Sequence, residues 1–114
     1  MGLKEGDNMN KNMTMVRGDT LSFAIEIEGL NQDLDTCYFS CKKDPSDDEY
    51  VFQKELEDGI EKVETGKYKI RVAPDDTKTI ETGNYYYDLQ IGVNDDIFTV
   101  LRGILKIEKE ITGE

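Results

Sequence analysis

Hydrophobic and polar residues alternate over most of this chain. The clearest case is residues 85–93, where five hydrophobic residues share one face: Tyr85, Tyr87, Leu89, Ile91 and Val93. The other face takes Tyr86, Asp88, Gln90 and Gly92. A period of two residues predicts a long β-strand with one buried face.

The same period recurs in six further segments: residues 21–27, 35–43, 50–54, 60–65, 67–72 and 97–107. Turn residues rich in Gly, Asn and Asp separate them, among them a hairpin turn predicted at residues 94–96. The last strand changes phase, which predicts a bulge at Arg102-Gly103 because glycine in a strand often marks one. Pro74 ends a strand, and the Asp and Thr residues after it are expected to cap one helical turn over residues 78–81.

About seven strands at short spacing, with almost no helical period, predict an all-β antiparallel sandwich or small barrel. The entry to the longest strand favours the sandwich. Glu81, Gly83 and Tyr85 have the spacing of the tyrosine corner that enters strand F of immunoglobulin-like domains. We therefore expect an immunoglobulin-like antiparallel β-sandwich of about seven strands, with Gly83 and Tyr85 as its structural corner.

The chain length of 114 residues predicts a single domain. Residues 1–12 show no period and are interpreted as a flexible N-terminal arm, and residues 13–114 as one β-sandwich domain. No apolar run reaches about 18 residues, so no transmembrane helix is expected. The first twenty residues also lack an apolar secretion signal.

The charge balance is strongly acidic, with 14 basic and 25 acidic residues and a formal net charge of −11. Such a field repels phosphate backbones and anionic membranes, so neither nucleic acid nor membrane is expected as a partner. It leaves two interpretations, a charge that keeps the protein soluble or one that meets a basic or metal-bearing surface.

The residue types offer no evident catalytic site. Histidine is absent, which removes most general-base and zinc chemistry. Cys37 and Cys41 would lie about 13 Å apart on one strand, too far for a disulfide, so both are predicted to be free core thiols. The paired acids at residues 47–48, 75–76 and 95–96 fit either turns or an acid/base or calcium site, and turn formation explains them better. No catalytic residue, metal site or cofactor is expected.

Two tyrosines are candidates for surface contact. Tyr86 and Tyr38 fall on the outward parity of their strands, where exposed aromatic rings are suited to binding sugar rings or other ligands. Arg17-Gly18-Asp19 has the letters of the integrin-binding tripeptide, but a glycine turn before a strand also explains it. Free strand edges would suit assembly by strand addition.

The succession of short motifs resembles small structural proteins of tailed phages and prophages, and the immunoglobulin-like N-terminal domain of phage upper baseplate proteins. The motifs that carry this resemblance are Arg17-Gly18-Asp19-Thr20, Cys41-Lys42-Lys43, Gly66-Lys67-Tyr68, Pro74-Asp75-Asp76-Thr77, residues 83–90, residues 99–107 and Ile111-Thr112. The long extension of baseplate proteins has no counterpart in this sequence.

The resemblance implies a non-enzymatic virion structural or tail/baseplate assembly protein that acts through protein–protein contacts. Its partners would be other phage structural proteins or further copies in a homo-oligomer. Its location would be the bacterial cytoplasm during assembly and then the virion. The alternative is a small carbohydrate- or surface-binding β-sandwich module. An enzyme is a third hypothesis, disfavoured because no nucleophile or acid/base set is visible.

Overall fold

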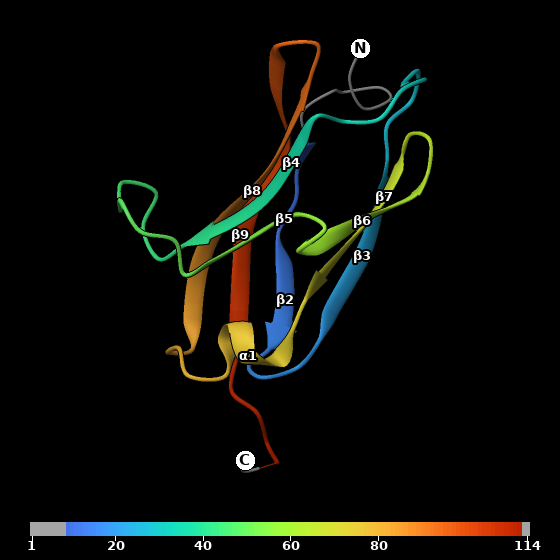
Figure 1. The fold of residues 1–114 in the computed structure, drawn as a ribbon. Coiled ribbons are helices and arrows are strands. Elements are labelled where there is room, and N and C mark those ends of the chain that lie inside the picture. Colours follow the sequence, from blue (N-terminus) through green and yellow to red (C-terminus); the bar gives the residue numbers. More distant parts are fainter. Residues whose placement is uncertain (1–8, 113–114) are drawn as a thin grey trace.

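The computed structural model describes residues 9–112, which are almost entirely β-structure (Figure 1). The strands are β1 (Met9–Asn10), β2 (Met13–Val16), β3 (Leu21–Glu26), β4 (Thr36–Lys42), β5 (Phe52–Leu56), β6 (Gly59–Glu64), β7 (Lys67–Val72), β8 (Gly83–Val93) and β9 (Asp96–Glu108), and one helical turn, α1 (Pro74–Thr77), precedes β8. The seven strands expected from the sequence are β3 to β9, and β1 and β2 are additional. Within the described range, no helix is long and apolar enough to cross a membrane.

The strands form a two-layer sandwich (Figure 1). One layer has the order β9-β8-β4-β5, with β1 and β2 both beside β9, and the other has the order β6-β7-β3. Strands β5 and β6 share only two residue pairs, where the hydrogen-bonded path passes from one layer to the other. Most pairs are antiparallel, but β1 and β2 run parallel to β9 and β5 runs parallel to β6.

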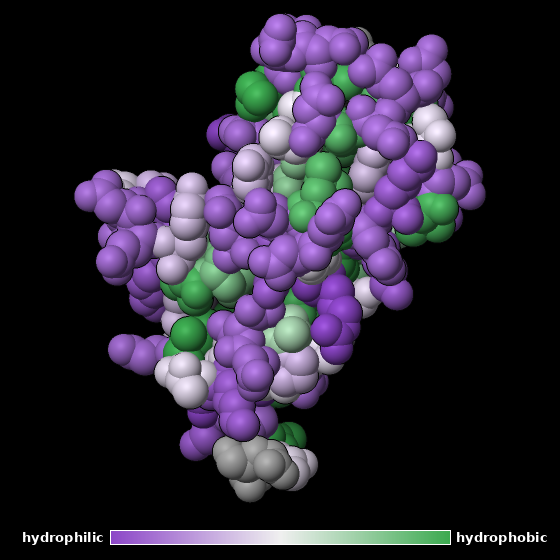
Figure 2. Space-filling model, in the orientation of Figure 1, coloured by the Kyte–Doolittle hydropathy of each residue, from purple (hydrophilic) through white to green (hydrophobic). Residues whose placement is uncertain are grey.

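The core lies between the layers and is filled from both. Phe39 of β4 is fully buried, and its ring lies 5.4 Å from the rings of Phe23 and Tyr87 and 6.0 Å from that of Phe52. Tyr68 of β7 is also buried, and its hydroxyl accepts a hydrogen bond from the Leu34 backbone N–H at 2.9 Å. The outside of the molecule is mostly polar, with hydrophobic residues in small clusters (Figure 2).

Strands β8 and β9 form the long hairpin that the sequence predicts. Asn94 and Asp95 both have positive φ, 54° and 69°, as a two-residue type I′ turn requires. The bulge is not at Arg102-Gly103, as expected, but earlier: Gln90 faces Thr99 and Leu89 faces Leu101, so Val100 is the extra residue. Val100 and Leu101 are consequently both buried, which is what changes the phase of the strand.

The expected flexible arm, residues 1–12, needs correction over its second part. Residues 1–8 lie outside the described range, but Met9–Asn10 pairs with β9 as β1. The chain then crosses Gly103, where a Cβ atom would lie only 2.1 Å from the Lys11 carbonyl oxygen. That carbonyl accepts a hydrogen bond from the Tyr87 hydroxyl at 2.5 Å. The glycine expected to mark a bulge instead leaves room for the N-terminal segment.

The helical turn also lies earlier than predicted. It spans Pro74–Thr77 rather than residues 78–81, because proline already has the φ angle of a helix and suits its first position. The Asp76 carboxylate accepts a hydrogen bond from the Ala73 N–H at 2.7 Å and forms an ion pair with Lys54 at 2.8 Å. Thr77 is fully buried, and its hydroxyl accepts from the Gly18 N–H, which joins α1 to the turn before β3.

Cys37 and Cys41 are free thiols in the core. Burial raises the pKa of each thiol to about 12, so the thiolate that reacts with electrophiles is scarce at neutral pH. We expect Ellman's reagent to titrate no thiol in the folded protein at pH 8 and two thiols in denaturant. Rapid labelling without denaturant would contradict this burial.

Candidate functional site

A groove of about 810 Å³ crosses the outer face of the β9-β8-β4-β5 layer. It is lined by Asn10, Tyr38, Ser40, Lys42, Pro45, Tyr50, Gln53, Tyr86, Tyr87, Asp88, Gln90, Arg102, Gly103 and Ile104. Most of these residues occupy the outward positions of neighbouring strands, because side chains alternate between the two faces of a sheet. We refer to this feature as the outer groove.

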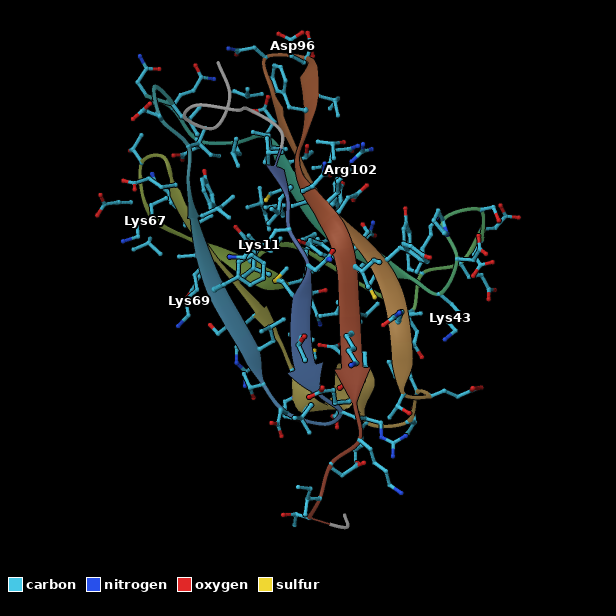
Figure 3. All side chains as sticks on the ribbon, turned by 180° about the vertical axis from the view of Figure 1, so that it is seen from behind. Lys11, Lys43, Lys67, Lys69, Asp96 and Arg102 are labelled. Carbon is cyan, nitrogen blue, oxygen red and sulfur yellow. The ribbon has the colours of Figure 1, made fainter. Side chains whose placement is uncertain are left out.

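Strand register places a polar row across the middle of the outer groove. Ser40 of β4 faces Asp88 of β8, and Asp88 faces Arg102 of β9. At one end of the row the Gln53 amide donates to the Ser40 hydroxyl at 2.9 Å. At the other end Nε of Arg102 donates to the Asn10 side-chain oxygen at 3.2 Å. Figure 3 shows Arg102 on the outer side of β9.

The floor of the outer groove carries two cations and one carboxylate, in contrast to the net acidic chain. Burial raises the pKa of Asp88, while the nearby charges of Lys42 and Arg102 oppose that rise. Neither cation forms an ion pair within 4 Å with any described carboxylate. Lys42 instead donates to the Asp47 carbonyl at 2.7 Å and lies 5.1 Å from the centre of the Tyr50 ring. The groove therefore suits a ligand with aromatic or acidic groups.

The two tyrosines expected at the surface both line this groove. Tyr86 faces Lys42 across the strands and is 41% exposed, while Tyr38 faces Gln90 and is half-buried. The cross-strand rows of the two tyrosines are four positions apart, about 13 Å along the strand direction. They mark two ends of the groove, with Asp88 between them.

The structural corner lies on the opposite, inner side of β8. Gly83 has φ of 137°, and the buried Tyr85 hydroxyl donates to the Glu81 carbonyl at 2.6 Å. This bond to a carbonyl a few residues upstream is the one that defines a tyrosine corner. Lys43 Nζ lies 4.5 Å from the centre of the Tyr85 ring and covers it. The corner fixes the start of β8 and is not part of the outer groove.

Replacing Tyr85 with phenylalanine should lower the free energy of unfolding by about 1 kcal/mol, because the Glu81 carbonyl loses its donor. Urea denaturation would measure the change. Tyr86→Phe on the exposed face is the matched control and should change stability by less than about 0.5 kcal/mol. Equal stability of Tyr85→Phe and wild type would argue against the corner hydrogen bond.

The other sequence candidates lie apart from the groove. Arg17 donates to the Glu110 carboxylate at 2.8 Å and to the Ile80 carbonyl at 3.0 Å, so its guanidinium is held within the fold. This observation favours the turn interpretation of residues 17–19 over integrin binding. Residues 9–112 contain no group of three or more His, Cys, Asp or Glu side chains placed to hold a metal ion.

Four residues of the outer groove are not identified as site residues by the sequence, for different reasons. Asp88 and Lys42 were placed correctly on outward faces, but their proximity depends on strand register. Arg102 was not identified because the bulge at Val100 reverses the parity of β9. Tyr50 was expected to begin a strand, whereas it precedes β5 and is 50% exposed.

Comparison with known proteins supports the fold and no family. No family model matches the sequence, and no curated protein matches it. Among solved structures, the extracellular domain of the voltage-gated sodium channel beta4 subunit matches with a TM-score of 0.50 and 12% identity, over 96% of this chain and all of that domain. The extracellular domains of that beta4 subunit form parallel homodimers that explain its role in cell–cell adhesion. Together with the strand topology, the match confirms the predicted immunoglobulin-like β-sandwich.

Proposed function

We propose that this protein is a non-enzymatic module that acts through protein–protein contacts. The observation that carries the proposal is the outer groove, which presents Tyr38, Tyr50 and Tyr86 together with Lys42 and Arg102 on one face of the sheet. Aromatic and arginine side chains are enriched at the centres of protein interfaces. In the sodium-channel domain the same architecture forms homodimers, so contact between folded domains is one established use of it.

The finer proposal is a structural or tail/baseplate assembly protein of a tailed phage or prophage. It is supported by the order of motifs from Arg17-Gly18-Asp19-Thr20 to Ile111-Thr112 and by the immunoglobulin-like fold that those motifs imply. Its partners are other phage structural proteins, and it passes from the bacterial cytoplasm into the virion.

Mass spectrometry of purified particles from an induced lysogen carrying this gene tests the role. Stoichiometric peptides in particles would support a virion component. Abundant protein in the lysate with none in particles would leave only the role of an assembly factor. If deletion of the gene also left particle formation unchanged, both roles would be overturned. The matched variants are Arg102→Glu, which reverses a groove charge, and Lys109→Glu, which reverses an exposed charge after β9 and outside the groove. Only Arg102→Glu should reduce incorporation.

The composition of the outer groove also favours a second candidate, a carbohydrate-binding module. Tyr38, Tyr50 and Tyr86 offer ring faces, and Asp88 and Gln90 offer hydrogen-bonding groups between them. Sugar binding uses this combination of stacking and polar contacts. A glycan array would decide: binding that Tyr86→Ala abolishes would support the candidate, and signal at background would remove it.

A further inference from the structure

Strand β3 is the last strand of its layer and has an open edge. It pairs with β7 over six residues without a register shift, and no other described strand pairs with it. At the opposite end of the hydrogen-bonded path, the outer edge of β9 is paired with β1 and β2. An open edge carries a row of backbone donors and acceptors to which another strand can be added.

The direction of these backbone groups follows from the pairing with β7. The Ile27 N–H donates to the Gly66 carbonyl at 2.7 Å, in the same register as the β3–β7 pairs. Hydrogen-bonding direction alternates along an antiparallel strand, so the odd-numbered residues of β3 point their backbone groups toward β7. Ser22, Ala24 and Glu26 therefore point theirs outward, at the open edge.

This edge lacks most of the features by which proteins prevent strand addition, and Glu26 is its one charged residue. Residues 21–26 contain no proline, no lysine and no bulge. On their inner face, Leu21 and Phe23 are only partly buried although both pack against the core. An added strand would cover these two side chains and satisfy the outward backbone groups together.

We propose that the occupant of this edge is a second copy of this chain, whose own β3 adds antiparallel with Ala24 facing Ala24 of the second copy. The two layers that contain β3 then form one continuous sheet across a two-fold axis. For the two strands to form backbone hydrogen bonds, residues whose N–H and C=O groups point to the open edge must face each other. Two registers near the centre of β3 meet this condition: Ala24 opposite Ala24, or Ala24 opposite Ser22.

Charge selects between the two registers. On β7, Arg71 faces Ser22, Lys69 faces Ala24 and Lys67 faces Glu26, and Figure 3 shows Lys67 and Lys69 projecting beside β3. With Ala24 opposite Ala24, Glu26 of the second copy lies beside Ser22 and within reach of Arg71. With Ala24 opposite Ser22, Lys69 of one copy looks across two neutral residues at Arg71 of the second copy. The first register also places Lys69 of one copy across two neutral residues from Lys69 of the second copy, but it has only one such like-charge row and two complementary rows of Arg71 and Glu26. The second register has two like-charge rows and no complementary row, so the first register is favoured.

The inner face is compatible with the same register. Phe23 faces Ile25 of the second copy in a pair whose side chains approach closely, which is the position where apolar pairs contribute most. Ala24 at the axis is the smallest side chain of β3 and leaves the backbones free to approach. The second copy is one partner for the assembly role proposed above. Dimerisation is measured on purified protein and incorporation on particles, so a failure of one is distinguishable from a failure of the other.

Sedimentation equilibrium of Ala24 variants tests the contact. Ala24→Pro removes the outward N–H but no bond to β7, so the fold should persist, as circular dichroism would show. Two hydrogen bonds between the copies are lost, and the dimer Kd should rise about tenfold or more. Ala24→Lys should act similarly by placing like charges on the axis, and Ala24→Ser should dimerise as wild type does. A wild-type monomer at every concentration, or a dimer unaffected by both Ala24→Pro and Ala24→Lys, would overturn the proposal.

Ala24→Cys tests the register. The Cα atoms of a hydrogen-bonded antiparallel pair lie about 5.5 Å apart, within disulfide range. Because Cys37 and Cys41 are buried and weakly acidic, the new thiol is the reactive one. Mild oxidation should give a covalent dimer from Ala24→Cys and much less from Ser22→Cys. With Ala24 opposite Ser22, neither variant places two cysteines opposite each other. A comparably low yield from both variants, or a higher yield from Ser22→Cys, would therefore overturn the register with Ala24 on the axis.

Discussion

Replacing Phe39 with alanine is expected to lower the free energy of unfolding by about 3–5 kcal/mol. The side chain has no exposed surface, and it meets aromatic rings from β3, β5 and β8. These strands come from both layers and leave little freedom for the core to collapse into the vacated space. Since domains of this size are stable by about 5–15 kcal/mol, the loss is a large share of the total.

Urea denaturation followed by circular dichroism would measure the loss. Val63→Ala is the control, because Val63 is 51% exposed and its truncation should change stability by less than about 0.5 kcal/mol. A loss below about 1.5 kcal/mol for Phe39→Ala would mean that the two layers are less tightly packed around this ring than the structure shows.

Alternation along the sequence was sufficient to assign the faces of the regular strands. In β4 and β8 each residue predicted to face the core is buried, including Cys37, Phe39 and Leu89. The period is informative because one face of each strand is covered by the other layer and the other face meets solvent. The hairpin at Asn94-Asp95 was also predictable, because few residue types adopt positive φ twice in succession.

The errors arise where the local pattern depends on a distant segment. Gly103 resembles a bulge residue, but its small size serves the approach of Lys11, 92 positions earlier in the chain. Val100 is hydrophobic like its neighbours, and only the pairing of β9 with β8 shows it as the extra residue. The position of α1 is a local exception, because Pro74 both follows the end of β7 and supplies the first residue of the helical turn.

The outer groove was only partly predictable for the same reason. The outward positions of Tyr38 and Tyr86 follow from the period, whereas their shared groove follows from the register of β4 against β8. The open edge of β3 could not be predicted from the local sequence. Its sequence predicts a strand, but which strand lies last in a layer is a property of the whole topology.

Replacing Gly103 with valine should destabilise the protein by about 1–3 kcal/mol and release residues 9–12 from β9. A Cβ atom there would lie 2.1 Å from the Lys11 carbonyl oxygen and 2.7 Å from its carbon, so the crossing segment must move. Moving it breaks the hydrogen bond from the Tyr87 hydroxyl to Lys11 and the one from the Ile104 N–H to Asn12. Hydrogen exchange should show faster exchange at Lys11, whose N–H donates to the Arg102 carbonyl.

Whether Gly103→Val raises or lowers the stability of the protein distinguishes two explanations for a glycine at this position. Valine favours strands and glycine weakens them, so a bulge or an ordinary strand position at Gly103 predicts that the variant is equally stable or more stable. Contact with the N-terminal segment predicts the opposite. Lys11→Ala is the control, because Lys11 takes part through its backbone and its side chain is exposed. If Gly103→Val is stable while residues 9–12 keep their slow exchange, the segment does not cross β9 at this glycine.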